Sequence, residues 1–163
     1  MPTLYSHPMS TYAQRVHIAL LEKGVTWDVK IVDMGKKEHR SPEYLAINPK
    51  GRVPALVTEH GVLTETPALL AYVAQRYAQA QLAPLDPFAF ARMQEFNNYL
   101  ASTVHVAHAH RPRASRWADE PASHADMLRK VPQNMAECFG VIERHYLQGP
   151  WVLGEQYSVA DAY

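Results

Sequence analysis

The stretch NPKGRVPALV, residues 48–57, places a proline at the start of an apolar run that is otherwise typical of a β-strand. Proline donates no ladder hydrogen bond, so within a sheet it is confined to edges, bulges or the first residue of a strand. Pro54 and the apolar residues 55–57 after it therefore predict a strand that the chain enters through a proline. What else Pro54 contributes depends on the segments around it.

The residues before this stretch alternate between strand and helix patterns. Residues 3–6 predict a short strand, and residues 11–23 predict a helix that is apolar around much of its circumference before Gly24 ends it. Residues 27–32 alternate and are rich in β-branched side chains, which predicts a second strand. Strand, helix and strand at this spacing form a βαβ unit. The polar stretch 35–44 that follows predicts no regular element.

The residues after the proline predict a hairpin and a helix. Two short apolar segments, 55–58 and 62–64, are separated by a polar turn, which is a hairpin signal. Thr66 and Pro67 are then typical of an N-cap and a first helical residue, and the apolar face of that helix extends to Tyr77. The first part of the chain is therefore expected to contain a βαβ unit followed by ββα.

The composition changes at residues 78–87, which are polar, rich in alanine and contain two prolines, and no strand pattern follows them. Such a segment is typical of a linker between domains. We therefore expect an α/β domain at residues 1–78, a linker at 79–87 and an all-α domain at 88–163.

Two long helices are predicted in the all-α part. One begins at Asp86 and Pro87 and has apolar residues up to Val104, and the other covers residues 123–146. Pro132 lies inside the second pattern and is expected to kink or split that helix, because proline removes one helix bond and clashes with the preceding turn.

Composition excludes several classes of protein. The 163 residues are 47% hydrophobic, which is enough for real cores, and 16 basic residues balance 16 acidic ones. Because no basic stripe stands out and no stretch is long and apolar enough to span a bilayer, we expect neither nucleic acid nor membrane as a partner. The N-terminus lacks a signal-peptide pattern, so we expect a cytoplasmic protein. The single cysteine, Cys138, is interpreted as a small buried hydrophobe.

The last residues, GPWVLGEQYSVADAY, indicate the start of a further helix. Ser158 and Asp161 have the spacing of a capping box, with Asp in place of the usual Glu or Gln. A helix of three residues buries nothing, so we expect that more helices follow in the complete protein.

Four segments of the chain resemble, in their order, those of the glutathione transferases. They are LYSHPMSTYAQRVHIALLEKG, NPKGRVPALV, ETPALLAYVAQRY and WVLGEQYSVADAY. The resemblance covers nearly the whole chain and implies a thioredoxin-like N-terminal domain packed against an α-helical C-terminal domain. It also implies a cytoplasmic homodimer that uses glutathione as co-substrate.

The resemblance gives Pro54 a second role. In this family the peptide bond before the corresponding proline is cis, which here is the Val53–Pro54 bond. The N–H and C=O of Val53 are then left to pair with an extended peptide as an added strand, and glutathione is a short peptide with backbone-like amides.

A transferase of this kind must hold glutathione as a thiolate, and the segment MSTYAQ offers hydroxyl groups at the start of a helix. Thr11 and Gln14 fit a capping box, which gives Thr11 a structural role and leaves Ser10 as the predicted thiolate donor. Related families place a catalytic Ser or Cys at the position of Ser10. Ser10 as the N-cap itself is the competing interpretation, and Thr11 and Tyr5 are the alternative donors.

The resemblance also implies where the charged groups of glutathione bind. Glu65 and Thr66 are similar to a Glu-Ser pair that faces the ammonium group and binds the γ-glutamyl carboxylate at a helix N-terminus. His39 and Arg52 are the cations expected near the glycyl carboxylate, and Lys37 is a weaker candidate.

Three histidines, His105, His108 and His110, lie close together in the segment VHVAHAHR. No acidic or thiol ligand is near them in the sequence, so we interpret this helix as lining the cleft between the domains or making a dimer contact. No metal is predicted.

Taken together, the residues predict a glutathione transferase that activates glutathione as a thiolate for attack on a small apolar electrophile. The alternative is a non-catalytic member of the family that acts as a binding or regulatory module. Glutathione-dependent isomerisation is a second enzymatic alternative, but the Ser-Ser-Cys run associated with that branch is absent.

Overall fold

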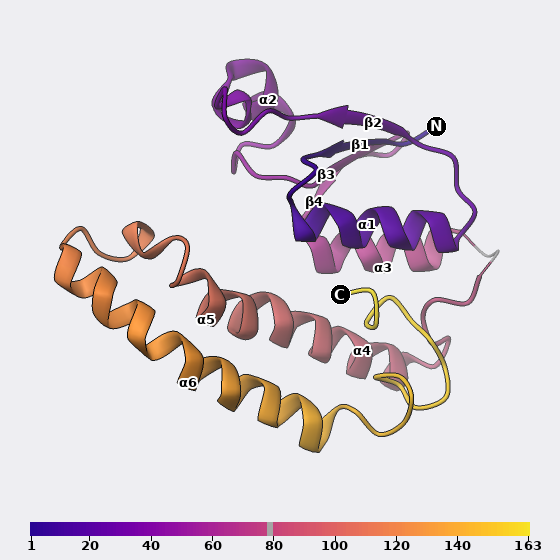
Figure 1. Ribbon diagram of the computed structural model, residues 1–163. Coiled ribbons are helices and arrows are strands. Elements are labelled where there is room, and N and C mark those ends of the chain that lie inside the picture. Colours follow the sequence, from indigo (N-terminus) through magenta and orange to yellow (C-terminus); the bar gives the residue numbers. More distant parts are fainter. Residues whose placement is uncertain (78–79) are drawn as a thin grey trace.

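The structure, a computed structural model, describes residues 1–77 and 80–163, so the expected domain boundary at residues 78–79 lies outside the described residues. The N-terminal part forms strands and helices in the predicted order, with two short helical segments more than expected (Figure 1). Its elements are β1 (Thr3–Ser6), α1 (Thr11–Glu22), β2 (Asp28–Ile31), the 3₁₀ helix η1 (Glu38–Arg40), α2 (Pro42–Ile47), β3 (Ala55–Thr58), β4 (Gly61–Thr64) and α3 (Thr66–Arg76).

The strands of this part form one mixed sheet in the order β2-β1-β3-β4. β1 and β2 are parallel, as a βαβ unit requires, whereas β3 is antiparallel to both β1 and β4. Leu4 of β1 is paired with Val29 on one side and with Leu56 on the other. With α1 and α3 packed side by side next to the sheet (Figure 1), this is the thioredoxin-like arrangement that the resemblance implies.

Helix α2 was not predicted, because six residues are too few to show a helical period. Its signal is local: Ser41 is the N-cap, its Oγ accepts a hydrogen bond from the Tyr44 N–H at 3.2 Å, and Pro42 fills the first helical position. Tyr44 is buried and its hydroxyl donates to the Arg52 carbonyl oxygen at 2.6 Å. α2 therefore holds the turn that leads into Pro54.

The C-terminal part is helical, as predicted. Asp86 caps the first helix by accepting a hydrogen bond from the Ala89 N–H at 2.8 Å. The expected long helix continues through a π-helical turn rather than as uniform α-helix. The elements are α4 (Pro87–Tyr99), the π-helix η2 (Leu100–Val104), α5 (His105–Ala109), the 3₁₀ helix η3 (Ala114–Arg116) and α6 (Pro121–His145).

Pro132 does not split α6, which is continuous over 25 residues (Figure 1). Pro132 is exposed, and Leu128, whose carbonyl oxygen loses its helix partner, is 49% exposed. Water can therefore replace the missing helix bond on this face. The expected small buried hydrophobe, Cys138, is 7% exposed on the same helix.

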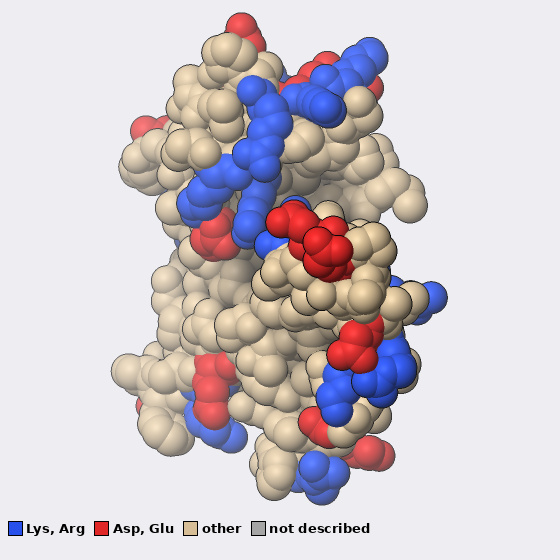
Figure 2. Space-filling model, turned by 90° about the vertical axis from the view of Figure 1, so that its left-hand side faces the viewer, with Lys and Arg blue, Asp and Glu red and all other residues tan. Residues whose placement is uncertain are grey.

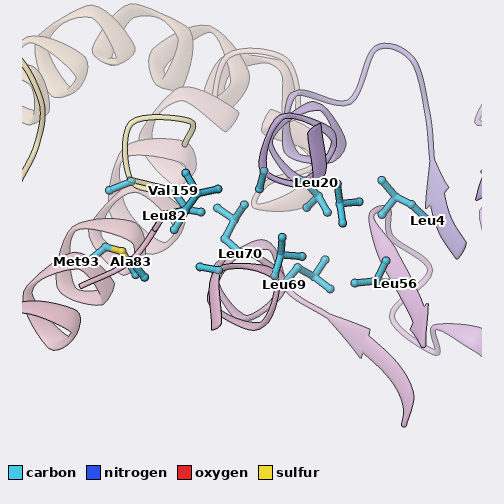
Figure 3. Packing of buried hydrophobic residues seen from close by; sticks show 14 of the residues in the cluster. Leu4, Leu20, Leu56, Leu69, Leu70, Leu82, Ala83, Met93 and Val159 are labelled. Atoms are coloured by element: carbon cyan, nitrogen blue, oxygen red, sulfur yellow. The ribbon is translucent and has the colours of Figure 1, made fainter. Parts of the chain in front are cut away.

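One hydrophobic core joins the two parts (Figure 3). It begins at the sheet, passes between α1 and α3, and ends against α4 and the C-terminal segment. Because these side chains are fully buried, they fix the N-terminal ends of α1 and α3 relative to the helical part. The fully buried members include Leu4, Leu56, Leu20, Leu69, Leu70, Met93 and Val159.

The predicted capping-box contact is present near the C-terminus. One oxygen of Asp161 accepts from the Ser158 N–H at 2.8 Å, and the other accepts from the Val152 N–H at 2.8 Å. The Val159 N–H donates to the Leu82 carbonyl oxygen at 2.9 Å, which ties this segment to the chain before α4. In the part of the chain that the structure describes, no helix combines the length and apolarity needed to cross a membrane.

Candidate active site

A cavity of about 520 Å³ lies between the two parts of the chain. Its N-terminal wall consists of the first residues of α1 and α3, η1 and the turn before β3, and its other wall consists of η2, α5 and η3. Figure 2 views this side of the molecule and shows Lys and Arg side chains gathered near the hollow between the two parts, with Asp and Glu side chains also at its rim.

The cavity brings together most of the residues that the sequence singled out. Tyr5 does not line it, because Tyr5 packs against Tyr44 with the ring centres 5.8 Å apart and lies beside Lys30. Lys37, the weaker cation candidate, is also outside its lining. The candidates that do line the cavity are Ser10, Thr11, His39, Arg52, Val53, Pro54, Glu65 and Thr66.

The N-cap of α1 is Ser10, so the prediction that Thr11 caps this helix is wrong. Ser10 Oγ accepts a hydrogen bond from the Ala13 N–H at 3.3 Å. Gln14 does not reach back to form a capping box with Thr11, since its Nε2 donates to the Pro8 carbonyl oxygen at 3.1 Å. Ser10 and Thr11 both fit the sequence pattern of an N-cap, and only the backbone conformation at Ser10 decides which of the two caps α1.

The capping hydrogen bond leaves the hydroxyl proton of Ser10 free to be donated. A serine hydroxyl has one donor and two acceptor positions, and the bond from the Ala13 N–H uses one acceptor. The O–H can therefore donate to an anion in the cavity. The partial positive charge at the N-terminus of the 12-residue α1 favours an anion at the same place.

The turn before β3 holds Val53 at the cavity wall. The Val53–Pro54 bond is cis, as expected. The Arg52 carbonyl oxygen accepts from the Tyr44 hydroxyl and from Asn48 Nδ2, each at 2.6 Å, which fixes the backbone just before Val53. No backbone hydrogen bond of Val53 is found within residues 1–77 and 80–163.

The start of α3 differs from the predicted cap. Glu65, not Thr66, occupies the N-cap position, and it makes no side-chain capping bond. Glu65 has φ +70°, a conformation that is costly for a residue other than glycine and that is found mostly at functional sites. Its carboxylate accepts from Lys50 Nζ at 2.6 Å. Thr66 is the first helical residue, only 5% exposed, and lines the cavity.

His39 in η1 has an unused polar atom. Its Nδ1 is buried and has no hydrogen-bond partner among the described residues. η1 lies close to Gly51, where a Cβ atom would come within 2.8 Å of the His39 carbonyl oxygen and φ is +59°. Glycine at position 51 thus allows His39 to approach Arg52 in the cavity wall.

On the other wall, His105 contacts Tyr12 edge-on with the ring centres 4.5 Å apart. The expectation that the histidine helix lines the cleft is met by His105. Arg15 lies over the rings of Tyr12 and Tyr163, at 4.8 and 4.2 Å from their centres. His110 stacks on Trp117 at 4.1 Å. No group of side chains able to hold a metal ion is found in the described residues.

Sequence reasoning missed the cations of the helical wall. Arg113 and Arg116 line the cavity from the segment RPRASRW, whose only sequence signal is a local excess of arginine. That excess is typical of any solvated loop, so the residues could not be assigned to the site without the fold.

The pKa of His105 predicts an acid-sensitive fold. Burial, with added repulsion from Arg113 and Arg15, lowers this pKa to about 4 from the usual 6.5. Between these values the unfolded chain binds a proton that the folded chain does not, so stability falls as pH drops through this window. For this half-buried ring we expect about 1 kcal/mol, or about 2–4 °C in Tm. The decrease in Tm between neutral pH and pH about 4.5 should be smaller for His105→Asn than for the parent. Equal decreases would show that His105 is not the source of the acid sensitivity.

Comparisons with known proteins match this arrangement. Residues 4–81 match the family described as glutathione S-transferase, N-terminal domain. The chain is 31% identical to glutathione S-transferase 3 of Zea mays over 98% of its own length and 73% of the relative. It is 33% identical to maleylacetoacetate isomerase of Pseudomonas aeruginosa, covering 98% and 76% of the two chains.

Among solved structures, a glutathione transferase homologue from Sulfitobacter with bound glutathione is 49% identical, with a TM-score of 0.92 over 100% of this chain and 78% of that one. The fold is therefore a thioredoxin-like domain joined to a helical domain. The chain belongs to the glutathione S-transferase family.

Proposed function

We propose that this chain is a glutathione transferase that holds glutathione as a thiolate beside Ser10, for attack on a small electrophile. The observation that carries the proposal is the position of the Ser10 hydroxyl, at the N-terminus of α1 and in the wall of the cavity. The bound glutathione of the Sulfitobacter homologue supports the choice of ligand.

In this proposal, each charged group of glutathione has a partner in the cavity wall. The γ-glutamyl carboxylate binds the hydroxyl and N–H of Thr66 at the start of α3, and the ammonium group faces Glu65. The backbone of the tripeptide pairs with Val53 as an added strand. The glycyl carboxylate binds His39 and Arg52, which would give the unpaired Nδ1 of His39 a partner.

The energies are sufficient for a thiolate. Lowering a thiol pKa from about 8.5 by about two units needs roughly 2.7 kcal/mol of selective stabilisation. A hydrogen bond from Ser10 to the charged sulfur supplies about 1.5–3 kcal/mol, and the start of α1 adds about 0.3–1 kcal/mol. The thiol proton goes to solvent, the sulfur forms a bond to carbon, and the leaving group departs with its electron pair.

The helical wall of the cavity supplies the binding site for the electrophile. Ala101, Val106 and Ala109 are small apolar residues on η2 and α5 that line the cavity opposite the start of α1. They suit the carbon skeleton of a small electrophile. We propose that catalysis takes place in the cytoplasm and that the active form is a homodimer.

Glutathione-dependent isomerisation is the second candidate, favoured by the 33% identity to the Pseudomonas aeruginosa isomerase. The run Ser10-Thr11-Tyr12 stands against it, because the Ser-Ser-Cys run of that branch is absent. In an isomerase, glutathione is regenerated, whereas a transferase consumes it in equal amounts with the electrophile.

Binding to immobilised glutathione, followed by turnover of 1-chloro-2,4-dinitrobenzene, tests the proposal. We expect retention on the resin, elution by free glutathione and stoichiometric release of chloride. Retention without turnover of any aryl chloride would favour the binding or regulatory module, and absence of retention would exclude both.

A further inference from the structure

Arg113 and Arg116 extend the helical wall of the cavity with positive charge. Both line the cavity, and neither forms an ion pair with a carboxylate in the described parts of the chain. Two guanidinium groups at the wall of a cavity are thus left without a counter-charge.

The two arginines lie one helical turn apart on the same wall of the cavity. Arg113 is the N-cap residue of η3 and Arg116 is its last residue, and the Arg116 N–H donates to the Arg113 carbonyl oxygen at 3.0 Å. Residues three apart in a 3₁₀ helix lie on the same side of it. The two guanidinium groups are therefore placed to bind one anion together.

The carboxylates of glutathione do not compensate these charges, and its thiolate brings one negative charge for two guanidinium groups. In the proposed binding mode its two carboxylates bind at Thr66 and at the pair His39 and Arg52, and its ammonium group faces Glu65. Glu65 is the acidic side chain in the cavity lining, and it already accepts a hydrogen bond from Lys50 at 2.6 Å. A further anionic group is needed to complement both Arg113 and Arg116.

We propose that the electrophile carries a carboxylate, and that Arg113 and Arg116 bind this carboxylate opposite the glutathione sulfur. The inference rests on the proposed transferase function and replaces the expected wholly apolar electrophile with an amphipathic one. Its carbon skeleton lies against Ala101, Val106 and Ala109, and its anionic end faces the arginines. Planar guanidinium groups bind carboxylates through two parallel hydrogen bonds, which also orients the reacting carbon.

A matched pair of substrates tests this inference. 4-Chloro-3,5-dinitrobenzoate and its methyl ester share the ring and the leaving group and differ in the negative charge. In both, the thiolate forms the carbon–sulfur bond, chloride leaves with the bonding electron pair and the thiol proton goes to solvent. Each kcat/KM is divided by the uncatalysed rate constant with glutathione at the same pH, which removes the difference in intrinsic reactivity.

For the parent protein we expect the normalised kcat/KM to favour the carboxylate by about tenfold. Arg113→Gln with Arg116→Gln should remove this preference and change the ester by less than about twofold. Arg111→Gln is the matched control, since Arg111 lies in the same segment but outside the cavity lining. The KM for glutathione should stay the same in all variants.

Two results would overturn the inference: a parent that favours the ester, or arginine variants that raise the KM for glutathione, which would assign these residues to glutathione instead. If neither substrate is turned over, the proposed function fails, and calorimetry with the two preformed S-aryl glutathione conjugates still decides the inference. The carboxylate conjugate should then bind about tenfold more tightly, and only with both arginines present; equal binding would refute the inference.

Discussion

Ser10→Gly is expected to lower kcat with 1-chloro-2,4-dinitrobenzene at neutral pH by about ten- to a hundredfold, with little loss of thermal stability. The rate falls because the hydrogen bond to the sulfur, worth about 1.5–3 kcal/mol, is lost. Stability is nearly kept because glycine is an acceptable N-cap, which costs only a few tenths of a kcal/mol relative to serine. Initial rates at saturating glutathione and a thermal melt measure the two effects separately.

Two further variants separate the capping role of Ser10 from its proposed chemistry. Ser10→Ala loses both the cap and the donor, so it should match Ser10→Gly in rate but lose about 0.5–2 kcal/mol of stability. Thr11→Ala removes the neighbouring hydroxyl, which makes no capping bond in the structure, and should leave both properties nearly unchanged. A rate loss in Thr11→Ala or Tyr5→Phe, without one in Ser10→Gly, would reject Ser10 as the donor.

Thr66→Ala is expected to weaken glutathione binding by about ten- to a hundredfold, because a hydrogen bond to a carboxylate contributes about 1.5–3 kcal/mol. No helix cap is lost, since Glu65, and not Thr66, occupies the N-cap position of α3. Stability should therefore change little. Isothermal titration with glutathione gives the affinity directly.

Thr66→Ser provides the control for this change. Serine keeps the hydroxyl and the backbone N–H, so its affinity for glutathione should stay within about threefold of the parent. If Thr66→Ala binds glutathione as tightly as Thr66→Ser does, the hydroxyl has no part in binding and only the backbone N–H is left as the proposed contact.

Strands and long helices could be predicted from the sequence because their patterns are periodic over several residues. The strand bounds Thr3–Ser6 and Ala55–Thr58 agree with the sequence, and so does the parallel pairing of β1 and β2 that a βαβ unit requires. Helix α2 escaped prediction because its six residues begin in a polar stretch and its signals, the cap Ser41 and Pro42 at the first helical position, are local. Elements held by one cap are defined by local geometry rather than by a repeating pattern.

The candidate site, too, could be predicted only in part from the sequence. The residues at Ser10, Val53, Pro54 and Thr66 belong to family segments, and the fold brings them to one cavity. Which hydroxyl caps α1 depends on backbone angles, such as ψ 105° at Ser10, that the order of residues does not specify. Arg113 and Arg116 come from the helical part, so their place in the cavity depends on how the two parts pack.

The pKa of glutathione bound to the protein, followed by ultraviolet thiolate absorbance across pH, tests most directly whether Ser10 holds a thiolate. In the parent we expect a value about two units below the ordinary thiol value of about 8.5, and in Ser10→Gly a value higher than that of the parent by at least about one unit, or 1.36 kcal/mol. A parent value close to that of free glutathione, or the same depressed value in parent and Ser10→Gly, would contradict the account.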